Sequence, residues 1–213
     1  MRGVIFDMDG LLFDSEALGI ICIREGGWLQ GYEIGEDVIR STLGETAAVS
    51  KPLYARLYPG IDPDRLFEDF GKGMRVRAEE KRIPLKKGAR ELLERLRERG
   101  IPCAVASSSP EEYVRLYLES QTVTPYFKVI VGAPKGIRSK PQPDIFLLAA
   151  EKLGVPAEEC MVLEDSENGI RAGRASGAFT VMVPDLIPYR EAFAPFVDAV
   201  VPDLLAVRER WFA

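Results

Sequence analysis

The chain of 213 residues contains no histidine. A serine–histidine–aspartate triad, a histidine–cysteine zinc site and a histidine general base are therefore all excluded. Proton transfer in any catalytic site of this chain must instead use carboxylates, lysine, tyrosine or cysteine. The absence thus removes several common classes of enzyme before any motif is considered.

Cysteine is scarce, and the three that occur, Cys22, Cys103 and Cys160, lie far apart in apolar surroundings. Because this pattern does not make a disulfide framework, we expect buried free thiols in a reducing cytoplasm. Long apolar runs are missing too, since none approaches the ~18 residues needed to span a bilayer and the N-terminal one is interrupted by acids. We therefore expect a cytoplasmic protein that does not enter a membrane.

The chain also lacks an excess of positive charge. Its 28 basic and 33 acidic residues give a net charge of −5, and 46% of its residues are hydrophobic. This balance favours a globular protein that does not bind nucleic acid. A phosphorylated substrate stays compatible with it, because local fields outweigh the global sum of charges. The length fits one domain, or a main domain with a small insert.

Short apolar runs bounded by turn residues recur along most of the chain. Most of them show no polar alternation, which is typical of strands that are buried on both faces. Helical segments separate them, so the pattern predicts an α/β fold with a parallel, doubly wound, Rossmann-like sheet. The predicted strands are Gly3–Phe6, Pro102–Ala106, Lys128–Val131, Cys160–Leu163, Phe179–Val183 and Asp198–Val201.

The helices between these strands carry recognisable start and stop signals. Ser109 and Glu112 have the spacing of a capping box, so we expect Ser109 to be a helix cap. Pro143 begins another predicted helix, which Gly154 ends. Ser166 is the predicted cap of a third, running to Gly177, and leucines at helical spacing from Ala89 to Leu96 indicate a fourth that ends at Gly100.

One interval, 15–82, shows helical patches but no strand pattern. We interpret it as a small helical domain inserted after the first strand, between core segments 1–14 and 83–213. The packing faces of its short helices are expected at Leu53, Leu57, Leu66, Phe67 and Phe70.

Two aspartates follow the first predicted strand. Asp7 and Asp9 come directly after Gly3–Phe6, and a bend at Gly10 lets both face one pocket. Ligands bind at the carboxyl ends of strands in such sheets, and paired carboxylates recruit a hard cation such as Mg²⁺. Taken alone, the pair also fits a solvated turn.

Polar residues end two further strands, and a lysine lies in a stiff loop. Ser107 follows one strand, and the helix N-terminus after it favours anion binding. Pro141 helps to fix Lys140, which can neutralise a phosphoryl group. Glu164 and Asp165 follow another strand, and Asp165 can complete a metal site. Each pattern alone also fits a structural role: a cap, a solvated lysine or a helix N-terminal acid. Together they supply the parts that phosphoryl transfer needs.

The chain resembles the haloacid dehalogenase superfamily, in the branch of β-phosphoglucomutase and sugar-phosphate phosphatases. Asp7 to Gly10 is similar to the first motif of that family, Ser107 to the second, Lys140–Pro141 to the third and Glu164–Asp165 to the fourth. The helical insert stands where this branch carries its cap. The resemblance covers nearly the whole chain.

The resemblance implies a role for each of these residues. Asp7 would be the nucleophile that forms an aspartyl-phosphate, and Asp9 the general acid and base. Mg²⁺ would be held by Asp7, Asp9 through its backbone carbonyl, and Asp165, with Glu164 as a further contact. The phosphoryl oxygens would be bound by Lys140, Ser107, Ser108 and the backbone at Met8. The family also implies a monomer that acts on a small phosphorylated metabolite. The position of the insert and its two chain crossings predict a cap that hinges near 14–16 and 83–87.

Two other functions stay open. A mutase of the β-phosphoglucomutase type needs a cap histidine and an arginine, whereas this chain has Gly19 at the first position and no arginine in Glu45–Val49. A non-catalytic phosphate-binding protein is the remote alternative. Relatives also show an acid before the loop lysine that is missing here around Pro134 and Lys135. Arg24, Arg40, Thr46 and Lys51 are cap residues that can face the leaving group, although we favour a surface position for each.

Overall fold

The computed structural model describes residues 1–42, 45, 47–133 and 136–213. Its centre is a parallel sheet of six strands in the order β3-β2-β1-β4-β5-β6, which confirms the predicted doubly wound α/β fold. Each strand lies within one or two residues of its predicted range. The strands are β1 (Gly3–Phe6), β2 (Cys103–Ser107), β3 (Phe127–Gly132), β4 (Cys160–Glu164), β5 (Phe179–Met182) and β6 (Ala199–Val200).

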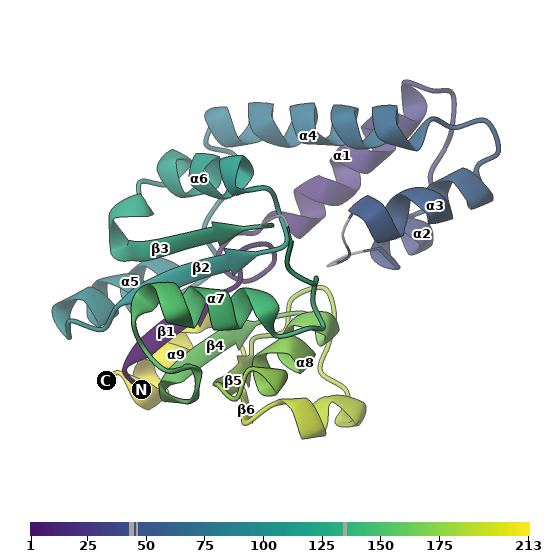
Figure 1. Ribbon diagram of the computed structural model, residues 1–213. Coiled ribbons are helices and arrows are strands. Elements are labelled where there is room, and N and C mark those ends of the chain that lie inside the picture. The colour runs from purple at the N-terminus through teal and green to yellow at the C-terminus, as the bar shows by residue number, and fades with distance from the viewer. Residues whose placement is uncertain (43–44, 46, 134–135) are drawn as a thin grey trace.

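Helices cover both faces of the sheet, because alternate side chains of each strand enter different apolar clusters. Val4 and Phe6 pack with helices α5 (Ala89–Glu98), α6 (Glu111–Ser120) and α9 (Leu204–Trp211). Ile5 packs on the opposite face with α7 (Asp144–Leu153), and α8 (Glu167–Ala175) also contributes there. Figure 1 shows α7 on one side of the strands and α5 and α9 on the other.

The predicted ends of the helices are largely confirmed. Gly154 ends α7 in the left-handed conformation with φ +74°, and Ser166 caps α8 by accepting a hydrogen bond from the N–H of Gly169. The prediction for Ser109 was wrong, since α6 begins after Pro110 without a side-chain cap. The hydroxyl of Ser109 is instead turned toward Asp9, to which it donates a hydrogen bond.

Four helices lie between β1 and α5, and Figure 1 shows them as a group above one end of the sheet. They have their own apolar cluster, which includes Ile23, Ile39, Tyr54 and Leu66. Leu66 is fully buried as predicted, whereas Leu57 is 45% exposed and does not serve the packing role that we assigned to it. The helices are α1 (Glu16–Trp28), α2 (Glu36–Arg40), α3 (Ala47–Leu57) and α4 (Pro63–Glu79).

The chain crosses between this helical cap and the sheet twice, and the two crossings lie side by side. The N–H of Asp14 donates to the carbonyl of Pro84 at 2.9 Å, and the N–H of Lys86 donates to the carbonyl of Leu12 at 2.8 Å. The predicted limits of the insert, 15 and 82, fall close to these hydrogen bonds. Those limits, and a hinge at this place, stay predictions.

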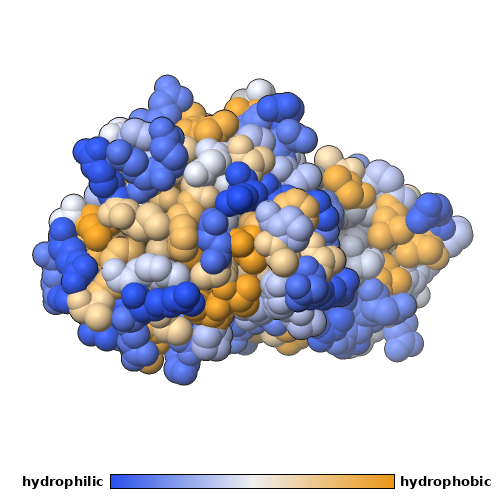
Figure 2. Space-filling view, turned by 90° about the horizontal axis from the view of Figure 1, so that it is seen from below, coloured by the Kyte–Doolittle hydropathy of each residue, from blue (hydrophilic) through white to orange (hydrophobic). Residues whose placement is uncertain are grey.

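The surface seen in Figure 2 mixes hydrophilic side chains with small apolar groups. Among the described helices, none has both the length and the apolar character that a membrane crossing requires. Cys22, Cys103 and Cys160 are buried free thiols, as predicted. Burial raises the pKa of the Cys22 thiol to about 11, so it stays protonated and unreactive at neutral pH.

Candidate active site

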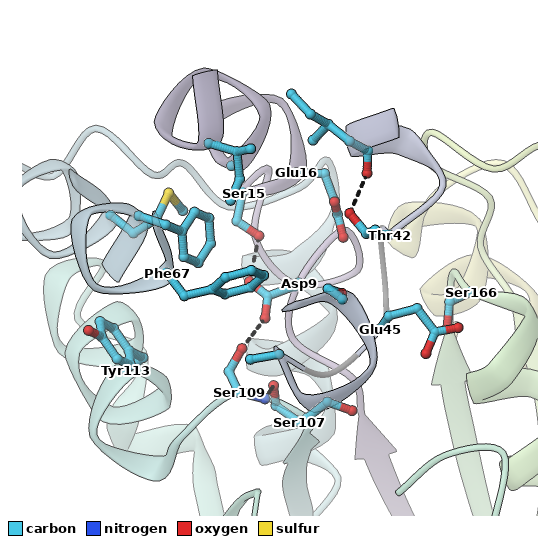
Figure 3. Close-up of a pocket in the computed structure, with 18 of the residues that line it drawn as sticks. Asp9, Ser15, Glu16, Thr42, Glu45, Phe67, Ser107, Ser109, Tyr113 and Ser166 are labelled. Atoms are coloured by element: carbon cyan, nitrogen blue, oxygen red, sulfur yellow. Dashed lines mark hydrogen bonds between the residues drawn. The ribbon is translucent and has the colours of Figure 1, made fainter. Parts of the chain in front are cut away.

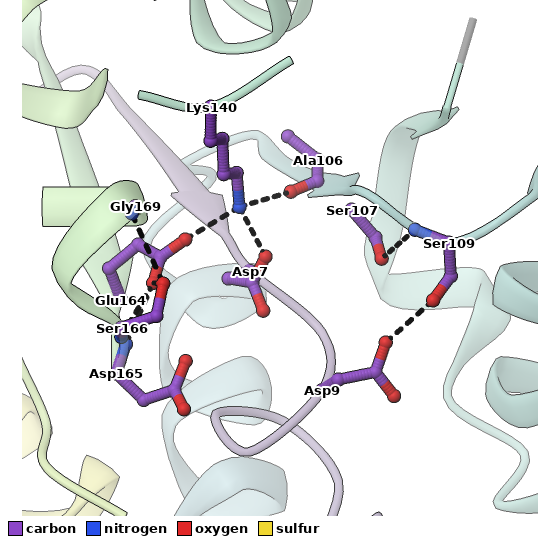
Figure 4. A network of polar contacts seen from close by, with 10 residues as sticks. All are labelled: Asp7, Asp9, Ala106, Ser107, Ser109, Lys140, Glu164, Asp165, Ser166 and Gly169. Carbon is purple, nitrogen blue, oxygen red and sulfur yellow. Dashed lines mark hydrogen bonds and ion pairs between the residues drawn. The ribbon is translucent and has the colours of Figure 1, made fainter. Parts of the chain in front are cut away.

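Polar side chains from three neighbouring strands meet at the carboxyl edge of the sheet. Asp7 follows β1, Ser107 ends β2 and Glu164 ends β4, and these strands are adjacent in the order β2-β1-β4. Parallel strands bring their carboxyl ends to one edge, so residues more than 90 positions apart become neighbours. Figure 4 shows this group together with Lys140 and Asp165.

Lys140 lies at the centre of the group. Its Nζ donates to Asp7 Oδ1 and to Glu164 Oε1, both at 2.5 Å, and its side chain is only 5% exposed. Burial alone would lower the pKa of Lys140, but the two carboxylates outweigh burial and raise that pKa above its ordinary value. Lys140 therefore stays a cation next to Asp7, as the predicted phosphate-binding role requires.

The carboxylates around Lys140 carry more negative charge than it can neutralise. Burial raises the pKa of Asp7 to about 7, although Lys140 opposes the shift. Burial, followed by repulsion from Glu164 and Asp7, raises the pKa of Asp165 well above its usual range. Three buried acids facing one lysine are in an unfavourable state, which a divalent cation would relieve.

The acids also lie close enough together to share such a cation. One carboxylate oxygen from each of Asp7, Glu164 and Asp165 lies within 4.8 Å of the other two. Gly10, with φ +78°, allows this packing, because a Cβ at that position would overlap Asp165. The donor set is oxygen only and buried, and it therefore fits a hard cation such as Mg²⁺ or Ca²⁺.

Glu164 is held differently from the other two acids. Its Oε1 accepts from Lys140, and its Oε2 accepts from the N–H groups of Asp165 and Ser166 and from the Ser166 hydroxyl, at 2.9–3.0 Å. The carboxylate fits under α8 because residue 169 is glycine, and a Cβ there would overlap it. Both oxygens of Glu164 are therefore engaged by the protein, an arrangement that suits orienting Lys140 better than ligating a metal.

Asp9 lies beside this cluster and makes contacts of its own. Ser15 donates to its Oδ1 at 2.7 Å and Ser109 donates to its Oδ2 at 2.8 Å. Burial still raises the pKa of Asp9 above its ordinary value, although both hydroxyls oppose that shift. One of these donors comes from the start of the helical insert and the other from the loop after β2, so Asp9 is oriented from two sides.

The residues predicted to bind phosphate fall into two groups. Ser107 and Ser108 line the same cavity as Lys140, and Ser107 accepts from the N–H of Ser109, which leaves its hydroxyl proton for a ligand. The side chain of Met8 is fully buried in the core, so any contact of this residue with phosphate must come from its backbone, and that contact stays a prediction. Pro134 and Lys135, around the missing acid before Lys140, lie outside the described residues.

The cavity above these groups measures about 340 Å³, and the cap and the core both line it. Figure 3 shows Glu16, Thr42 and Phe67 from the cap, with Asp9, Ser107 and Ser109 from the core. Sequence reasoning missed Ser109 and the aromatic part of the wall. The spacing of Phe67 and Phe70 marked them as packing residues, but no local pattern shows that they line a cavity.

The basic cap residues that we considered for substrate contact do not line this cavity. Arg24 and Arg40 both pair with Glu36, at 3.0 and 2.8 Å, and Lys51 pairs with Asp64 at 2.7 Å. This agrees with the surface positions that we favoured. Thr46 lies outside the described residues.

The structure so far defines an α/β enzyme fold with an acid–lysine site at the sheet edge and a helical cap above it. Residues 1–177 match the family model for haloacid dehalogenase-like hydrolases. The chain therefore belongs to the haloacid dehalogenase-like hydrolases, as its motifs led us to expect.

Two curated relatives and one solved structure are similar to most of this chain. It is 34% identical to the phosphorylated carbohydrates phosphatase of Thermotoga maritima, over 83% of this chain and 82% of that protein. It is 34% identical to hexitol phosphatase B of Escherichia coli K12, over 84% and 82%. A β-phosphoglucomutase of Clostridium difficile matches with a TM-score of 0.83 over 99% of this chain and 95% of the other, at 21% identity, which shows the fold alone.

Proposed function

We propose that this protein is a Mg²⁺-dependent phosphatase that hydrolyses a small phosphomonoester, a sugar phosphate or similar metabolite, through an aspartyl-phosphate on Asp7. The observation that carries the proposal is the buried group of Lys140, Asp7 and Asp165, which lines a cavity of about 340 Å³. The phosphatase relatives at 34% identity support the same reaction class.

The contacts of each residue support the role that we propose for it. Asp7 attacks phosphorus, and Lys140 lets the anionic carboxylate approach the anionic phosphate because it carries a fixed positive charge between them. Ser107 and Ser108 donate to the phosphoryl oxygens. Mg²⁺, held by Asp7, Asp165 and the backbone carbonyl of Asp9, would supply a further positive charge that stabilises the transferring phosphoryl group.

Asp9 is the general acid and base of the proposal. It protonates the oxygen of the leaving group in the first step, and it takes a proton from the attacking water in the second step. Its raised pKa favours the protonated form that the first step needs. The hydroxyls of Ser15 and Ser109 orient the carboxyl group for both steps.

A mutase is the second candidate, since that activity occurs on the same fold. The cavity of this chain has Gly19 where a mutase would use its cap histidine, and the chain has no histidine at all. We therefore favour the phosphatase. Supplying β-glucose 1-phosphate with a bisphosphate activator separates the two, because a mutase would form glucose 6-phosphate without releasing phosphate.

The largest test is the replacement Asp7→Asn. Wild type should release phosphate from p-nitrophenyl phosphate only with Mg²⁺, and Asp7→Asn should lower kcat by roughly 10⁴-fold or more, because the nucleophile is lost. Asp64→Asn, on the exposed surface of the cap, is the matched control and should keep full activity. Borohydride trapping in the steady state should convert Asp7 of the wild type to homoserine, as seen by peptide mass.

Other outcomes would reject the proposal. Without turnover of any phosphomonoester by the wild type, the remaining candidate is a phosphate-binding protein. Full activity of Asp7→Asn would exclude the aspartyl-phosphate. The hinge near 14–16 and 83–87 is tested separately by limited proteolysis, where a phosphate mimic with Mg²⁺ should protect both segments if the cap closes over the cavity.

A further inference from the structure

The cap wall of the cavity differs in chemistry from the wall at the sheet edge. Its cap wall is largely apolar and partly aromatic, with the rings of Phe67 and Phe70 6.2 Å apart between centroids. Tyr113 and Tyr117 add aromatic surface from α6 on the core side. The large aliphatic and phenylalanine side chains of the cap on this wall are Ile23, Ile39, Phe67, Phe70 and Met74.

The charges on the described lining are almost all negative. Lys140 is the sole cation among these lining residues, and Asp7 and Glu164 already engage it. Glu16 and Glu45 lie on the cap side of the cavity. Glu45 accepts a hydrogen bond from Asn168 at 3.0 Å, whereas no described side chain pairs with the carboxyl group of Glu16.

These two observations limit what the leaving group can be. A leaving group with a second phosphate or a carboxylate would lose its water in this cavity and meet acids without a free cation among the described lining residues to compensate, which is strongly unfavourable. An uncharged ring would instead bury an apolar face against aromatic side chains, which favours binding. Hydroxyl groups on the same ring can still reach Glu16 or the hydroxyl of Thr42.

Resting on the phosphatase function above, we propose that the substrate carries a single phosphate on an uncharged leaving group that presents an apolar ring face to Phe67 and Phe70. Glu16 and Glu45 are then specificity residues that reject a second anion. The same arrangement excludes bisphosphates as good substrates, and it accounts for a phosphatase rather than a mutase at this site.

The test compares substrates that differ in one charge. Phenyl phosphate is paired with 4-carboxyphenyl phosphate, and glucose 6-phosphate with glucose 1,6-bisphosphate. The member with the extra anion should show a kcat/KM at least ~10-fold lower, mostly through KM, because like charges meet in the binding site. Equal kcat/KM values within both pairs would overturn the inference. Failure of the wild type to hydrolyse any compound would reject the phosphatase function instead.

Variants separate the two parts of the inference. The double variant Glu16→Gln, Glu45→Gln should reduce the difference in kcat/KM between the two substrates of each pair. An unchanged difference would refute the role of these acids. Phe70→Ala should raise KM for phenyl phosphate by roughly 5–10-fold through lost apolar contact, and an unchanged KM would refute the ring contact. Val76→Ala, exposed on the same helix α4, is the control and should change neither. Phe67→Leu provides a milder second variant if Phe70→Ala fails to fold.

Discussion

The two ends of the cavity are built from different interactions. At the sheet edge, each of Asp7, Asp9, Lys140 and Glu164 has a charged or hydroxyl partner within 2.8 Å. On the cap side, the wall is largely apolar and partly aromatic, and its polar members include Glu16, Thr42 and Glu45. The difference teaches that the reacting groups depend on a network that tolerates few changes. The cap wall depends on packing instead, since Ile39 and Met74 are almost fully buried.

Among the variants that test this comparison, removal of the positive charge of Lys140 should have the largest effect. Lys140→Met leaves the buried carboxylates of Asp7 and Glu164 without a counter-charge. We expect kcat to fall by roughly 10²–10³-fold, and the free energy of unfolding at pH 8 to fall by about 3–5 kcal/mol. Steady-state kinetics and urea titration measure the two effects.

Lys140→Arg is the informative companion to this variant. It keeps the charge but cannot copy the geometry of an ammonium between two carboxylates, so it should regain stability more than activity. Equal recovery of both would show that charge alone matters at this position.

A side chain in the space under α8 tests how Glu164 holds Lys140 in position. Gly169→Ala places a Cβ onto the carboxylate of Glu164 and must displace it. We expect a loss of about 2–4 kcal/mol in the free energy of unfolding, because the core cannot expand around a buried ion pair. Activity should also fall, by roughly 10-fold, as Lys140 loses its orientation.

Gly100→Ala serves as the control for this substitution. Gly100 also has a positive φ, +64°, but a Cβ there meets no atom within 4 Å. It should cost only about 1 kcal/mol through backbone strain and leave kcat unchanged. Similar losses in both variants would mean that backbone conformation, and not contact with Glu164, explains the effect at 169.

The sheet-edge end was largely predictable from the sequence, and the cap end was not. Buried strands such as Gly3–Phe6 are contiguous apolar runs, and a parallel sheet brings the residues that follow them to one edge. That rule predicts that Asp7 and Asp165 meet, whereas the order of the strands was not predicted from the sequence. Their catalytic roles remain a proposal that the variants above are designed to test.

No comparable rule predicts which residues line the cavity wall. Phe67 and Phe70 have the helical spacing of ordinary core residues, and only the packing of the cap onto the core decides that they line a cavity. The prediction that Ser109 is a helix cap was wrong for a related reason. Its local pattern fits a helix cap, but its hydroxyl donates instead to the buried carboxylate of Asp9, 100 positions earlier in the chain.

Removing that hydroxyl should have a smaller effect than the changes around Lys140. Ser109→Ala leaves Asp9 with one donor, Ser15, and frees its carboxyl group to rotate. We expect kcat to fall by roughly 5–10-fold with little change in stability, since one hydrogen bond is worth about 1 kcal/mol. Ser120→Ala, whose hydroxyl bonds only a helix carbonyl, is the control. A rise in KM with kcat unchanged would contradict an orienting role for Ser109.

The smallest expected effect concerns Glu16 of the cap and its response to pH. Burial, reinforced by repulsion from Asp9, Asp185 and Asp7, raises the pKa of Glu16 from 4.5 to about 8. A carboxyl group with a raised pKa in the folded state stabilises the protein fully below its unfolded pKa. That contribution is lost as the pH rises through about 8, where the group must ionise inside the cavity.

Glu16→Gln removes this titration and should therefore make the chain less sensitive to alkaline pH. In metal-free buffer we expect the variant to match the wild type at pH 5 and to exceed its stability by roughly 1–2 kcal/mol at pH 9. This value lies below the full linkage energy because Glu16 keeps part of its surface in solvent. The exposed Glu33→Gln provides the baseline. A variant less stable than the wild type at pH 9 would mean that Glu16 makes a favourable ionic contact, and the contrast between the two ends of the cavity would then be weaker than the contacts indicate.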